Sequence, residues 1–161
     1  MIQRVQSIYL ALALIAAILL FFFPIVSFVH LNQVANDSIK ELIEIRATGK
    51  YAETIEGFKQ IQTYLANLIA LGGIMVGLVA AIFSYKNRKQ QTLICWAVIL
   101  LTIVLSVLTM LKVQPENTPA VSNWTVKTGA YLLSVILILT LFARKAIAKD
   151  EALIKSVDRL R

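Results

Sequence analysis

The sequence predicts an all-α fold: an integral membrane four-helix up-down-up-down bundle, formed as a single transmembrane domain by residues 1–161. Apolar residues make up 58% of the chain and charged residues only 16%, whereas roughly a quarter of the residues of a soluble domain are charged. Four apolar runs have about the 20 residues that a helix needs to cross a bilayer. The expected spans are residues 7–29, 62–85, 92–111 and 128–145.

The first expected span, residues 7–29, contains no charged residue. A secretory signal peptide has an apolar region of only about 7–15 residues that ends at a cleavage site between small residues, whereas this run continues through Pro24. We therefore expect a first helix that is not cleaved. Because proline removes a backbone donor, Pro24 predicts a kink in the last third of that helix.

Residues 30–61 form the expected outer loop, which holds four cations and five carboxylates. Apolar residues recur in it at helical spacing, at Ile39, Leu42 and Ile43. The pattern predicts a short amphipathic helix over residues 38–47 that lies on the outer surface or caps the bundle. The single histidine, His30, begins this loop. No partner at the spacing of a proton relay or a metal site accompanies it, so we interpret His30 as a polar cap at the membrane interface.

The second expected span carries small residues four positions apart, at Gly73, Gly77 and Ala81. Residues four apart lie on one face of a helix, and small side chains let a neighbouring backbone approach closely. These three are the predicted helix-packing residues. Two occupants of their face fit the pattern: another helix of the same chain, or a second copy of the protein in a homodimer.

The third expected span contains the single cysteine, Cys95. One cysteine allows neither an intramolecular disulfide nor a paired-cysteine redox centre, so we interpret Cys95 as a packing residue. The span also holds three hydroxyl side chains. We expect them to bond to the backbone of their own helix, as hydroxyls in membrane helices commonly do: Thr102, Ser106 and Thr109.

Residues 146–161 form the expected cytoplasmic tail, which follows the fourth span. Four apolar residues of this tail share one helical face, which Asp150 interrupts: Ala146, Leu153, Val157 and Leu160. We therefore expect a helix that continues from the fourth span and lies against the membrane surface or a partner.

The formal charge is concentrated on one side of the predicted bilayer. Residues 1–6, the polar turn at 86–91 and residues 144–161 hold ten cations and three carboxylates, whereas the outer segments hold six of each. Lys and Arg in short loops stay on the cytoplasmic side, so we expect both termini there. Basic residues near an anionic leaflet also bind the lipid bilayer, the first expected partner. The topogenic, membrane-surface residues are Lys86, Arg88, Lys89, Arg144 and Lys145.

Three stretches resemble a known family: the opening residues 1–10, MIQRVQSIYL, the corner at residues 85–89, YKNRK, and the ending at residues 149–161, KDEALIKSVDRLR. They resemble the domain-of-unknown-function 4293 family of small four-span membrane proteins of Bacteroidota. The resemblance implies a multi-pass protein of the bacterial inner (cytoplasmic) membrane and implies no activity. It directs attention to the chain terminus as a partner docking site, with a solvated topogenic tail as the alternative: Asp158, Arg159, Leu160 and Arg161.

The residues support no enzyme, cofactor or metal hypothesis, because no catalytic or ligating constellation can be argued from their spacing. The cations lie beside the spans and not with aromatic platforms, so we expect no nucleic-acid binding. We predict a non-enzymatic accessory or assembly subunit whose partner is another membrane protein or a second copy. The alternative is a small oligomeric transporter or channel. However, no ionisable residue lies in the central part of any expected span, and coupled transport usually needs one.

Overall fold

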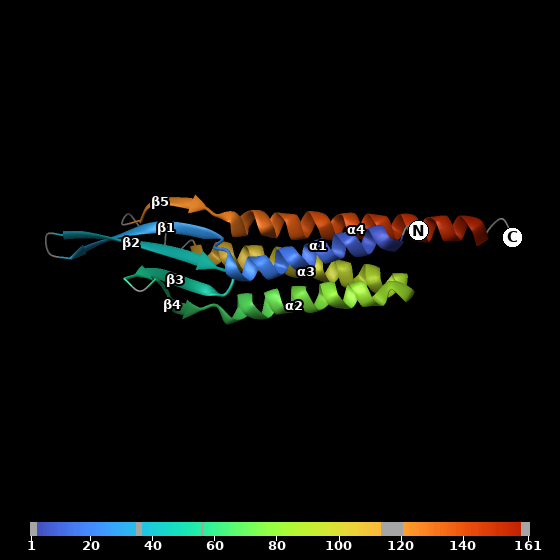
Figure 1. Cartoon of the computed structure of the whole chain (residues 1–161), viewed down its shortest axis with the longest axis horizontal. Helices are drawn as coiled ribbons and strands as arrows, with labels where there is room; N and C mark the ends of the chain where they lie inside the picture. The colour runs from blue at the N-terminus through green and yellow to red at the C-terminus, as the bar shows by residue number, and fades with distance from the viewer. Residues whose placement is uncertain (1–2, 35–36, 56, 114–120, 159–161) are drawn as a thin grey trace.

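The computed structural model describes residues 3–34, 37–55, 57–113 and 121–158. A sheet lies at one end of the elongated molecule and four long helices lie at the other (Figure 1). The helices are α1 (Gln3–Phe22), α2 (Leu65–Phe83), α3 (Arg88–Val113) and α4 (Thr128–Asp158), with a 3-10 turn, η1 (Ser84–Lys86), between α2 and α3. The strands are β1 (Val26–Val34), β2 (Asp37–Arg46), β3 (Gly49–Thr54), β4 (Gly57–Thr63) and β5 (Val121–Val126).

All four helices are long and apolar enough to cross a membrane. The qualifying segments are Val5–Phe22, Leu65–Phe83, Arg88–Val113 and Thr128–Leu153. Each of them also presents large apolar side chains outward, for example Ile15, Val76, Leu100 and Ile138. An outer surface of this composition is unfavourable in water, and it is consistent with a membrane protein.

Each of the four helices packs against two of the others. Helix α1 contacts α2 and α4, and α3 contacts the same two helices. Helices α1 and α3 end next to the sheet, whereas α2 and α4 begin there (Figure 1). Helix α4 is the longest, and its last turns extend beyond the ends of the other helices, on the side away from the sheet (Figure 1).

The prediction of an all-α fold is wrong, because residues 30–61 contribute to an antiparallel sheet of strand order β4-β3-β2-β1-β5. The amphipathic helix expected over residues 38–47 is replaced by β2. Ile43 and Ile45, two residues apart, share one face of this strand and are both buried. They lie opposite Phe28 and Val26 of β1. Branched side chains at a spacing of two are typical of a strand, and this spacing outweighs the helical one.

The expected first span is also too long, because α1 ends at Phe22 and residues 26–29 belong to β1. No kinked helix passes through Pro24. Proline lacks the backbone donor that a helix needs, and it disfavours helical geometry in the preceding residue, Phe23. The chain therefore leaves the helix before Pro24 and enters the sheet.

Backbone hydrogen bonds attach the sheet to the helical part. The Ile25 amide donates to the Ile45 carbonyl at 2.8 Å, and the Ile25 carbonyl accepts from the Lys127 amide at 2.9 Å. The amide of Gly129, in the first turn of α4, donates to the Pro24 carbonyl at 2.8 Å. A Cβ atom at Gly129 would lie 2.7 Å from the Pro24 carbonyl oxygen, so only glycine permits this approach.

The polar turn predicted over residues 86–91 is shorter than expected, because α3 already begins at Arg88. Asn87 directly precedes α3, and the side-chain oxygen of Asn87 accepts a hydrogen bond from the backbone amide of Gln90 at 3.3 Å. Asn is a favoured residue at this capping position. At the other end of the chain α4 runs without interruption through residues 146–158, so the tail is helical as far as the structure describes it.

Candidate functional site

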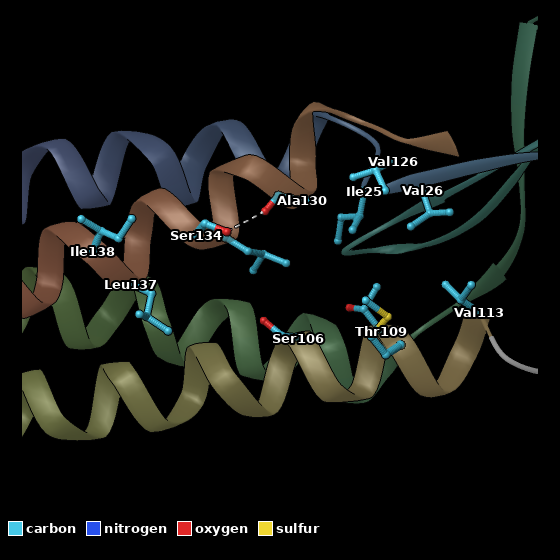
Figure 2. Close-up of a pocket in the computed structure, with 12 residues that line it drawn as sticks. Ile25, Val26, Ser106, Thr109, Val113, Val126, Ala130, Ser134, Leu137 and Ile138 are labelled. Carbon is cyan, nitrogen blue, oxygen red and sulfur yellow. Dashed lines mark hydrogen bonds between the residues drawn. The ribbon is translucent and has the colours of Figure 1, made fainter. Parts of the chain in front are cut away.

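A cavity of about 690 Å³ lies between α3 and α4 where these helices meet the sheet. Figure 2 shows Thr109 and Val113 of α3 on one side of it and Ala130 of α4 on the other. Ile25 and the strand residues Val26 and Val126 close the end next to the sheet. The sequence indicates no cavity here, because its walls come from segments about 100 residues apart in the chain.

The hydroxyl groups that line this cavity are already bonded to the backbone. The Ser106 hydroxyl donates to the Thr102 carbonyl at 2.9 Å, and the Thr109 hydroxyl donates to the Leu105 carbonyl at 2.8 Å. Thr102 makes the same kind of bond, to Val98 at 2.8 Å, so the prediction for all three hydroxyls is confirmed. The cavity therefore presents mostly carbon to an occupant.

The lining of the cavity reaches the outer surface of both helices. Met110 of α3 and Ile138 of α4 line it, and their side chains are 65% and 47% exposed. Other lining residues are buried, among them Val113 and Leu133. A molecule would thus enter from the outer surface of the helices.

The structure places the predicted helix-packing residues of α2 against α3. A Cβ atom at Gly73 would lie 3.2 Å from Leu101, and one at Gly77 would lie 2.7 Å from Val98. Ala81, one turn further, is fully buried. A helix of the same chain therefore occupies this face.

Two buried amide side chains also connect α2 and α3. The Asn67 amide donates to the Thr109 hydroxyl at 3.2 Å, and the Gln91 amide donates to the Ala81 carbonyl at 3.0 Å. Such bonds hold helices together in an apolar medium. The sequence analysis did not predict these two interhelical bonds. A single amide side chain in or beside an apolar run is the pattern that could have indicated them.

A third buried polar pair joins the two ends of the chain. The Gln6 amide of α1 donates to the carboxylate of Asp150 in α4. Both side chains are buried, and Asp150 is only 4% exposed. The sequence shows Asp150 as an interruption of the apolar face of the tail. A charged residue on an apolar helical face can indicate a contact with another helix. The sequence did not reveal that Gln6 is the partner of Asp150.

The predicted topogenic residues lie on three separate elements. Lys86 belongs to η1, Arg88 and Lys89 to the first turn of α3, and Arg144 and Lys145 to α4. The structure brings Arg144 over the ring of Trp96, 4.0 Å from its centroid, a cation–π contact between α4 and α3. Asp158 is the last residue of α4, whereas Arg159, Leu160 and Arg161 lie outside the described residues.

The sheet carries a charged cluster of its own. Arg46 of β2 pairs with Glu44 at 3.0 Å. Its guanidinium also lies 4.7 Å from the ring centroid of Tyr51 in β3 and 5.7 Å from that of Phe58 in β4. The cluster ties three strands together. Within the described residues, no three His, Cys, Asp or Glu side chains gather as a metal ion would require.

Comparison with known proteins places the chain in a family. No curated protein matches it. The family described as "Domain of unknown function (DUF4293)" matches residues 2–160, which is nearly the whole chain. The match includes all four apolar helices and every strand of the sheet. The protein therefore belongs to the DUF4293 family.

Proposed function

We propose that this is a multi-pass protein of the bacterial inner (cytoplasmic) membrane, with its four helices as an up-down-up-down bundle and both termini in the cytoplasm. The apolar outer surface of the helices supports insertion. The net charge of +7 on residues 1–6, 86–91 and 144–161 supports the orientation, because basic segments remain cytoplasmic. In this orientation the sheet lies on the side of the membrane that faces away from the cytoplasm.

The function that we propose is that of a non-enzymatic accessory or assembly subunit of a membrane complex. Its main support is the length of α4. A helix of 31 residues extends for about 46 Å, which exceeds the hydrocarbon core of a bilayer by about 16 Å. The extra turns are charged and project from the end of the molecule opposite the sheet (Figure 1).

The contact between Gln6 and Asp150 supports a docking role for the segment beyond it. The contact anchors α4, eight residues before its end, to the first turns of α1. An anchored helix loses little conformational entropy when a partner binds, because its backbone is already ordered. The proposed docking residues are Asp158, Arg159, Leu160 and Arg161, and the proposed partner is another membrane protein or a second copy of this one.

Native purification of a truncated chain tests this proposal. Removing residues 154–161 keeps Asp150 and its bond to Gln6, and it removes a net charge of two. The double variant Lys59→Gln/Lys112→Gln removes the same charge from two exposed residues outside the topogenic set and keeps the tail. We expect a stoichiometric companion with the full chain and the double variant but not with the truncated chain. A companion that remains after truncation would overturn the docking role.

The alternative from the sequence, a small oligomeric transporter or channel, has a separate test. The cavity between α3 and α4 presents mostly carbon, and the protons of its hydroxyls are already donated to backbone carbonyls, so it gives a polar solute little compensation for lost water. Solute or ion flux into liposomes that contain this protein alone would favour the transporter instead.

A further inference from the structure

The cavity between α3 and α4 accepts an apolar occupant that arrives from the side. Its hydroxyls, on Ser106, Thr109 and Ser134, donate to their own helices. Its lining reaches the outer surface at the exposed side chains of Met110 and Ile138. In a membrane, the medium outside these two residues is lipid hydrocarbon. An occupant would therefore come from the bilayer and not from water.

The size of the cavity favours a slender chain over a helix. Its volume of about 690 Å³ lies within the range of about 300–1,000 Å³ that is usual for small-molecule sites. One turn of an α-helix about 11 Å wide already fills about 500 Å³. A partner helix would thus place little more than one turn inside, whereas a lipid acyl chain would lie along the groove between Leu137 and Thr109.

A basic residue that follows the lining in the chain favours an anionic lipid. Lys127 directly follows the lining residue Val126, and its side chain is exposed. No Asp or Glu occurs between residues 121 and 149. We propose that the cavity binds one acyl chain of an anionic phospholipid from the leaflet on the sheet side, with the head group at Lys127. This binding site rests on the proposed membrane insertion and is independent of the proposed partner.

Native mass spectrometry of the full chain in mild detergent tests the site, with phosphatidylglycerol and phosphatidylcholine as the added lipids. We expect one molecule of phosphatidylglycerol to stay bound. The variant Ala130→Phe fills the cavity from α4, so the bound fraction should fall about tenfold or more. A second filling variant, Ser134→Leu, changes an exposed lining residue and should lower the bound fraction in the same direction.

Ala97→Phe is the matched control for the filling variants. Ala97 is exposed on α3 and does not line the cavity, so this variant should retain lipid as the natural chain does. Equal retention by all variants, or no retained lipid in the natural chain, would overturn the proposal. So would a stoichiometric polypeptide whose binding Ala130→Phe abolishes, because the cavity would then hold a partner.

The head-group contact has its own pair of variants. Lys127→Gln should lower the preference for phosphatidylglycerol over phosphatidylcholine by about fivefold, the usual effect of one lysine at an anionic membrane surface. Lys112→Gln should change it by less than about twofold, because the Lys112 ammonium lies 5.6 Å over the Tyr64 ring, next to α2. Equal effects would contradict the placement of the head group at Lys127.

Failure of the lipid site and failure of membrane insertion give different results. Extraction of isolated membranes with alkaline carbonate reports insertion alone. A chain that stays in the membrane pellet and yet binds no lipid refutes only the lipid site. A chain that appears in the supernatant refutes the membrane insertion on which the site rests.

Discussion

At the residue scale, the surroundings of a glycine decide whether a larger side chain could replace it. Gly77 and Gly72 lie on the same helix and have opposite surroundings: a Cβ atom at Gly77 would lie 2.7 Å from Val98, whereas a Cβ atom at Gly72 would meet no atom within 4 Å. Val98 is buried and stiff at χ1, so it cannot move aside easily. The spacing of small residues predicted the importance of Gly77, but only the structure identifies its neighbour.

We expect Gly77→Leu to lower the free energy of unfolding by about 1–3 kcal/mol, the usual cost of overpacking. The midpoint of thermal unfolding in mild detergent measures the effect. Gly72→Leu is the control, and it should leave the midpoint unchanged or raise it, because leucine favours a helix more than glycine does. Equal midpoints for the two variants would show that α2 and α3 do not meet at Gly77.

Asp150 gives a second prediction at this scale. Asp150→Ala leaves the buried Gln6 amide without its acceptor, and an unsatisfied buried group costs about 1–3 kcal/mol. The last turns of α4 should then be cleaved by protease faster. Lys149→Ala, at the exposed neighbouring residue, should change the unfolding free energy by less than about 0.5 kcal/mol. Unchanged proteolysis of Asp150→Ala would contradict the anchoring role of this pair.

At the scale of elements, apolar runs without charge predicted the helices, whereas the strands could not be predicted in the same way. Residues 38–47 satisfy a helical and a strand pattern at once, because isoleucines at 39 and 43 are four apart and those at 43 and 45 are two apart. Pairing with β1 decides between the two patterns. That pairing is a tertiary contact, so local sequence alone could not reveal it. The cavity depends on the same contacts, since Val26 and Val126 reach it only through the sheet.

The strand assignment predicts which isoleucines of the sheet matter. Ile45→Ala removes a fully buried side chain from β2, and we expect a loss of about 2–5 kcal/mol of unfolding free energy. Ile61→Ala in β4 is the matched control, because Ile61 is 63% exposed, and its cost should be below about 0.5 kcal/mol. Denaturation monitored by circular dichroism distinguishes them. A similar cost at both positions would contradict the sheet.

At the scale of the whole molecule, an apolar helical layer lies between a sheet at one end and basic segments at the other. Composition and charge were sufficient to predict the four apolar helices and the orientation now proposed. They could not predict the contacts between distant residues, such as Gln6 with Asp150, which are 144 positions apart. The central claim is that a membrane separates the sheet from the basic corner and the tail.

Labelling of single cysteines with a membrane-impermeant maleimide tests this claim most directly. In a Cys95→Ala background, Lys59→Cys reports on β4 and Lys89→Cys on the start of α3, both at exposed positions. We predict that Lys59→Cys is labelled in intact spheroplasts and that Lys89→Cys is labelled only after the membrane is permeabilised. Labelling of both cysteines before permeabilisation, or the reverse order, would contradict the account.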